Sequence, residues 1–152
     1  MAKPVLLARP HPFIVSEMKP FLEQNGYVPT KVDTVSDIPK KVTGSFGAII
    51  SLAVVSSMPE SVEIVFSELR KSASRLPVLF ASMLDFDSVK SSLERLAGPK
   101  LDQTAIFAVS HVNESNPALG KPDTFLYLGK DDLASPAQRE KAGRVILKHF
   151  SR

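Results

Sequence analysis

The stretch Phe46-Gly47-Ala48-Ile49-Ile50-Ser51-Leu52-Ala53-Val54-Val55 is the most apolar run of the chain. It is bounded by Gly44 on one side and by Ser56-Ser57 on the other. A near-continuous run of β-branched and aliphatic residues between such breakers is typical of a strand buried on both faces of a parallel sheet. The run therefore predicts an α/β fold with helices on both faces of the sheet.

Strand and helix patterns alternate on both sides of this run. The sequence predicts strands at 4–8, 27–35 and 77–82, helices at 12–25 and 85–96, and a short helix or connector at 37–42. It also predicts a helix with Ser57 as its cap and Pro59 in its first turn. Pro29 places the strand at 27–35 at a sheet edge, and Pro20 should kink the first helix. We expect a doubly wound, mostly parallel five-stranded sheet with the flavodoxin-like order 2-1-3-4-5.

Two apolar runs, 104–110 and 124–129, compete for the fifth strand. A connection of ordinary length after the helix at 85–96 favours 104–110, and 124–129 would then be an added strand or part of an extended fifth connection. The alternative places 124–129 fifth and makes 99–123 an insertion that carries an extra strand. The segment between the runs, 111–123, is rich in turn residues and predicts a surface loop.

The last helix begins at Ser135-Pro136-Ala137-Gln138, which combines a capping box with proline at the first helical position. Its predicted buried face consists of Ala142, Val145, Ile146 and Phe150. No repeat or linker interrupts the chain, so we expect residues 1–152 to form a single domain.

Composition excludes several classes of protein. The chain has 152 residues, of which 43% are hydrophobic and 23% charged, as in a globular domain rather than a disordered one. No apolar run approaches the roughly 20 residues of a membrane helix, and the N-terminus lacks a secretory pattern, so we expect a cytoplasmic protein. Cysteine is absent, and His11, His111 and His149 match no metal-ligand spacing. Glycine-rich phosphate loops are also absent, so neither a metal nor a cofactor is expected.

Positive charge gathers in the C-terminal helix. Residues 138–152 contain one acid, Glu140, against five bases: Arg139, Lys141, Arg144, Lys148 and Arg152. The plainer interpretation is a solvated helix face whose cations suit the negative end of the helix dipole. The alternative is docking to an acidic partner or to a phosphate backbone. Nucleic-acid binding is not supported, because the phenylalanines fall on apolar faces and no helix-turn-helix pattern occurs.

Several short sequence segments, spread over about 95 residues, resemble the response-regulator receiver (CheY-like) family. They are Val5-Leu6-Leu7-Ala8 followed by His11-Pro12, Phe21-Leu22-Glu23-Gln24-Asn25-Gly26-Tyr27, Phe46-Gly47-Ala48-Ile49-Ile50, Met58-Pro59 and Pro77-Val78-Leu79-Phe80-Ala81-Ser82. The resemblance implies that Ser82 occupies the place of the family's switch serine or threonine. The family's phosphate-sensing lysine would match Lys130 if 124–129 is the fifth strand, and would be replaced by Ser110 if 104–110 is.

The chain departs from the family where receivers carry their acids. Receivers hold Mg²⁺ through an acidic pair after the first strand, but this chain has Arg9 and Pro10 there. Receivers end their third strand with the aspartate that accepts the phosphoryl group, but 46–55 contains no acid. Ser51 offers a hydroxyl without an evident base. Phospho-aspartate chemistry needs a carboxylate nucleophile and oxygen ligands for a divalent ion.

The first hypothesis is therefore a pseudo-receiver, a non-enzymatic adaptor or regulatory module that binds a protein of a signalling pathway. Its partner surface would include Arg139, Lys141, Arg144 and Lys148, and a homodimer is compatible with the family. The second hypothesis is a small flavodoxin-like enzyme or anion-binding protein. It would use a crevice at the ends of the first and third strands, near Arg9, His11, Ser51, Ser82 and Lys130. The third is the receiver part of a DNA-binding response regulator.

Overall fold

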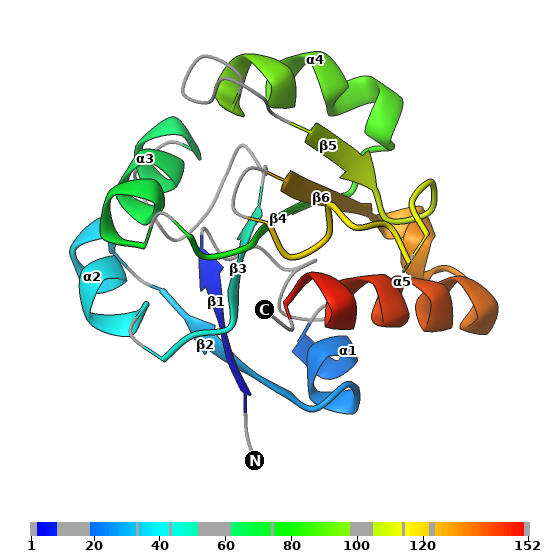
Figure 1. The fold of residues 1–152 in the computed structure, drawn as a ribbon, viewed down its shortest axis with the longest axis horizontal. Coiled ribbons are helices and arrows are strands. Elements are labelled where there is room, and N and C mark those ends of the chain that lie inside the picture. Colours follow the sequence, from blue (N-terminus) through cyan, green and yellow to red (C-terminus); the bar gives the residue numbers. More distant parts are fainter. Residues whose placement is uncertain are drawn as a thin grey trace.

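The computed structural model describes residues 3–8, 19–32, 34–42, 44–51, 62–73, 75–97, 105–113, 115–121 and 124–150. These residues form one six-stranded sheet in the order β2-β1-β3-β4-β6-β5, and every neighbouring pair of strands is parallel. Figure 1 shows helices on both sides of this sheet. The predicted doubly wound α/β architecture is thus confirmed, and the sixth strand is the extra strand expected from the two apolar runs within 104–129.

The elements follow one another in near-regular alternation. The strands are β1 (Lys3–Ala8), β2 (Tyr27–Lys31), β3 (Gly47–Ser51), β4 (Val78–Ser82), β5 (Ala105–Ala108) and β6 (Thr124–Gly129). The α-helices are α1 (Lys19–Gln24), α2 (Ile38–Lys41), α3 (Val62–Ser72), α4 (Phe86–Ala97) and α5 (Pro136–His149), and the 3-10 helices are η2 (Val35–Asp37) and η4 (Lys130–Leu133). β2 lies at an edge of the sheet, as Pro29 predicts.

Two hydrophobic clusters fill the two faces of the sheet. Side chains alternate between them along each strand, so that Val5 faces one cluster and Leu6 the other. We call the cluster beneath α1 and α5 the α5 face, and the cluster beneath α2, α3 and α4 the α3 face; α3 and α5 lie on opposite sides of the sheet in Figure 1. Every described residue of β3 is buried, as its apolar sequence predicts.

The preference for 104–110 as the strand beside β4 is wrong. β6 pairs with β4, from Val78↔Phe125 to Ser82↔Gly129, and β5 lies at the outer edge. All six residues of β6 are buried, whereas Ile106 and Phe107 of β5 are only half-buried. The longer strand, β6, takes the central position, where a strand is covered on both faces and both edges.

The connection from β5 to β6 covers one face of the sheet, as a crossover helix would, although its described residues form no helix. β1 to β2 and β5 to β6 both step backwards along the sheet, whereas the other connections step forwards. Right-handed crossovers of opposite direction lie on opposite faces, which places the segment 109–121 on the α5 face together with α1. Val112 and Leu119 are buried there. The predicted surface loop therefore covers part of the core.

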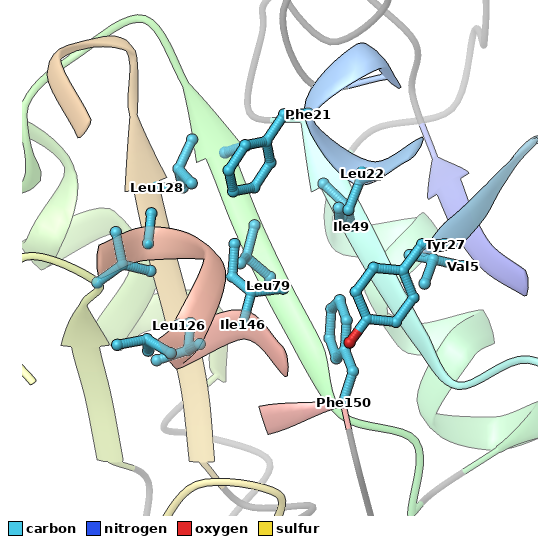
Figure 2. Packing of buried hydrophobic residues seen from close by; sticks show 14 of the residues in the cluster. Val5, Phe21, Leu22, Tyr27, Ile49, Leu79, Leu126, Leu128, Ile146 and Phe150 are labelled. Atoms are coloured by element: carbon cyan, nitrogen blue, oxygen red, sulfur yellow. The ribbon is translucent and has the colours of Figure 1, made fainter. Parts of the chain in front are cut away.

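The C-terminal helix closes the α5 face. Ser135 caps it by accepting a hydrogen bond from the Gln138 backbone N–H at 3.2 Å, as predicted. The four residues of the predicted buried face are all buried. Phe150 stands edge-on to Tyr27, with ring centroids 5.9 Å apart (Figure 2). Its ring lies directly over Gly47, where a Cβ atom would be 2.4 Å from two ring carbons.

Candidate functional site

The ends of the first and third strands lie side by side, as the sequence predicts. Ala8 of β1 pairs with Ile50 of β3, and β3 ends at the buried Ser51. Arg9 and His11 lie outside the described residues, so their predicted place in this crevice stays a prediction. Within the described part of both strands no carboxylate is present, because their sequences are Lys-Pro-Val-Leu-Leu-Ala and Gly-Ala-Ile-Ile-Ser.

Ser82 lies at the end of β4 in a closed ring of three hydrogen bonds. The Tyr127 hydroxyl donates to the Leu84 carbonyl at 2.5 Å, because a carbonyl can only accept. Ser82 Oγ therefore donates to the Tyr127 oxygen at 2.5 Å and accepts from the Leu84 backbone N–H at 3.0 Å. Burial raises the pKa of Tyr127, so the phenol keeps its proton. The ring fixes the backbone that follows β4.

Tyr127 is a site residue that sequence reasoning missed. It lies in the run 124–129, three residues before Lys130, and the apolar pattern of that run predicts a strand but no polar site. A tyrosine in a fully buried strand is the available signal, because a buried hydroxyl needs a polar partner.

Ser51 and Ser82 do not converge on one pocket. Ser51 pairs with Ala81, one residue before Ser82, so the two serines occupy alternate positions on neighbouring strands. Ala81 belongs to the α5 face, while Tyr127, the partner of Ser82, belongs to the α3 face. Their side chains therefore point to opposite faces of the sheet. This geometry weighs against a crevice in which both hydroxyls bind one anion.

Lys130 begins η4 directly after β6, the strand beside β4. With 124–129 in this place, the receiver resemblance would match Lys130 to the phosphate-sensing lysine, and that match stays a prediction. Ser110, the other candidate, follows the edge strand β5.

A pocket of about 260 Å³ lies at the carboxyl ends of β4, β6 and β5. Its polar lining residues are Asp85, Asp87, Ser110, His111, Asp131, Asp132 and Gln138. The chain leaves β4 for the α3 face and leaves β6 for the α5 face, and such a divergence of neighbouring strands opens a crevice. Asp85 and Asp87 lie far from Asp131 and Asp132 in the sequence, and the pairing of β4 with β6 brings the two pairs together.

The electrostatics of this pocket are negative. Burial raises the pKa of Asp132, against the opposing effect of the Gly129 N–H, which donates to its Oδ2 at 2.8 Å. The neighbouring Asp131 raises that pKa further, and His111 lowers it. Among the described residues, no group of three or more His, Asp or Glu side chains is arranged to hold a metal ion.

The four cations assigned to a partner surface do not form one cluster, because three of them divide between two sides of α5. Arg139 lies over the ring of Phe21, 5.6 Å from its centroid, and lines a hollow between α1 and α5. Lys141 and Arg144 line a different groove, beside the loop at 111–113. Lys148 is exposed near the end of the helix and belongs to the described lining of neither.

No protein-family model matches the chain, and no curated protein matches it. Solved structures do match in fold. A response regulator receiver domain protein from Clostridium thermocellum is 13% identical with a TM-score of 0.55, and the match covers 99% of each chain. A response regulator receiver protein from Sinorhizobium medicae is 14% identical with a TM-score of 0.54, over 98% of this chain and 97% of the other.

The third match is the receiver domain of a sensor histidine kinase from Pseudomonas aeruginosa, solved with magnesium ion coordinated in its active site cleft. It is 13% identical with a TM-score of 0.58, and the match covers 100% of both chains. The chain thus has a CheY-like receiver fold with an additional edge strand. Within the described residues, no helix has the length and apolarity needed to cross a bilayer.

Proposed function

We propose that this protein is a cytoplasmic pseudo-receiver, a signalling adaptor that binds a protein partner without taking a phosphoryl group on aspartate. The observation that carries the proposal is the absence of acids from the sequence around the first and third strands. The first acid of the chain is Glu17, and none occurs from Ile38 to Pro59. A receiver-type phosphoryl transfer lacks both its nucleophile and its magnesium ligands there.

The surface after β4 supports a role in protein binding. Met83 and Leu84 are 53% and 57% exposed, and they follow each other directly. The Leu84 backbone is held on both sides, since its N–H donates to Ser82 and its carbonyl accepts from Tyr127. Large apolar side chains on a fixed backbone lose little entropy when a partner covers them.

The first test is chemical. The purified protein is incubated with acetyl phosphate and Mg²⁺ and its intact mass is measured, beside a receiver that keeps its acids as the positive control. Thermal unfolding is followed with Mg²⁺ alone and with Mg²⁺ plus beryllofluoride. We expect no mass increment and no stabilisation. A labile increment on this protein would restore a phosphorylation switch, and Asp131→Asn and Asp132→Asn would then locate it.

The second test concerns the partner. A protein recovered with the tagged chain must rebind the purified chain in the absence of a phosphodonor. Met83→Ser combined with Leu84→Ser should weaken that binding, whereas Ile64→Ser should not, because Ile64 is similarly exposed at 52% but lies on α3. The proposal is contradicted if binding requires a phosphodonor, or if the double substitution of Met83 and Leu84 leaves the affinity for the partner unchanged.

A further inference from the structure

A polar groove of about 350 Å³ lies between the loop at 111–113 and α5. Its described lining consists of two valines and four polar or cationic residues: Val112, Val145, His111, Asn113, Lys141 and Arg144. The valines are buried and form an apolar floor, whereas the other four side chains are exposed. No carboxylate is among these lining residues.

Lys141 is held in place at the groove. Its Nζ donates to the Ser110 carbonyl at 2.7 Å, across 31 positions of sequence. An ammonium has three donors, so a bond to one carbonyl leaves donors for a ligand. Because the side chain is already ordered, ligand binding costs less conformational entropy than it would with a freely moving lysine.

Arg144 lies one helical turn further along the same side of α5. Its Nη1 donates to Glu140 at 2.9 Å, an i,i+4 pair on the helix surface. A guanidinium presents five donors in a planar fork, which matches the two oxygens of a carboxylate. Lys141 and Arg144 therefore offer an anion two permanent positive charges above the valine floor.

His111 separates a basic region of the surface from an acidic one. This residue lines both the basic groove and the pocket that contains Asp85, Asp87, Asp131 and Asp132. The aspartates repel an extended polyanion such as a nucleic-acid backbone that would run along this edge of the molecule. A short anionic side chain that enters from the α5 side avoids these aspartates.

We propose that this groove binds the carboxylate side chains of an acidic segment on a protein partner. The inference rests on the proposed function for the existence of a partner, and it adds the chemistry by which that partner is recognised. Lys141 and Arg144 hold the carboxylate, and the exposed Asn113 and His111 line the groove beside it.

The binding test uses a fluorescein-labelled peptide rich in glutamate, a lysine-rich peptide of the same length, and inorganic phosphate. Fluorescence anisotropy should show saturable binding of the glutamate peptide, at least about tenfold tighter than the lysine peptide. Raising the salt concentration from about 0.05 M to about 0.5 M should weaken it at least about tenfold, because the contacts are ionic and exposed. Binding of phosphate without binding of the glutamate peptide overturns the assignment to carboxylates.

Matched variants locate the site. Asn113 Oδ1 accepts from the backbone N–H of Ser115, and Asn113→Asp keeps that acceptor while placing a negative charge in the groove. Asn113→Asp and the pair Lys141→Gln with Arg144→Gln should each weaken peptide binding about tenfold. The control pair is Lys40→Gln with Lys71→Gln, on α2 and α3, which removes the same net charge from exposed positions on the opposite face.

The control pair should change the affinity less than about twofold. Thermal unfolding checks that each variant is folded. Equal losses in groove and control variants mean that net charge alone attracts the peptide, which overturns the site. Failure of the peptide test together with an absent phosphorylation increment would refute the groove and leave the proposed function standing.

Discussion

Lowering the pH should reduce the free energy of unfolding of this protein, because one buried histidine is neutral in the folded state. His149 is fully buried at the end of α5, where its Nδ1 accepts from the Gly120 N–H at 3.0 Å. Its Nε2 lies 3.2 Å from the Val78 carbonyl and donates to it. The ring is therefore neutral with its proton on Nε2, and it joins α5 to the β5–β6 connection and to β4. A proton on Nδ1 would break the bond to Gly120.

Burial lowers the pKa of His149 to about 4 from the ordinary value of 6.5, although the bond to Val78 works against the shift. The folded pKa lies below the unfolded one, so the unfolded chain takes up the proton first. Stability from this group is complete above about pH 7.5 and is lost as the pH falls through 6.5 towards 4. With these two pKa values, the loss between pH 7.5 and pH 5 is about 2 kcal/mol.

The free energy of unfolding is measured by urea denaturation at several pH values between 5 and 7.5, for the wild type and for His149→Gln. Glutamine can accept from Gly120 and donate to Val78, yet it does not titrate. The wild-type curve should fall by about 2 kcal/mol more than the variant curve over this range. Parallel curves for wild type and His149→Gln would refute the reasoning.

Three further substitutions test the packing. Gly47→Ala should destabilise the protein by about 1–3 kcal/mol, because its Cβ would press into the Phe150 ring; Phe150→Leu in the same chain should recover part of that loss, and additive effects in denaturation would contradict the contact. Tyr127→Phe should cost about 1–3 kcal/mol by opening the hydrogen-bonded ring at the end of β4, and an unchanged midpoint in urea would argue against that ring. Leu119→Ala should cost about 2–5 kcal/mol although the residue lies in a loop; a loss below 0.5 kcal/mol, typical of a surface position, would mean that the loop does not cover the core.

The candidate site was only partly predictable. The pattern placed Ser82 at the end of β4, and the position of β6 makes Lys130 the residue that follows the strand beside it. Tyr127, the partner of Ser82, lies 45 positions away, and only the pairing of β4 with β6 brings the hydroxyls together. The cations of α5 were all found, but their division between Arg139 on one side and Lys141 with Arg144 on the other depends on what packs beside the helix.

The sequence by itself determined the secondary-structure elements and the absence of the acids that phosphoryl transfer to aspartate requires. Apolar periods of two and of three to four residues, together with caps and breakers, are local properties, so strands, helices and the buried side of α5 could be predicted from them. The lack of acids near the first and third strands is likewise a fact of composition.

Only the tertiary structure decided which run lies beside β4, that the segment 109–121 covers the core, and where the groove and the aspartate pocket lie. These features depend on contacts between residues far apart in the chain, such as Lys141 with Ser110 and His149 with Val78. The apolar pattern of a segment predicts that it is buried, but it does not predict which other segment packs against it. The choice between 104–110 and 124–129 was therefore settled by which run could be buried on both faces and both edges.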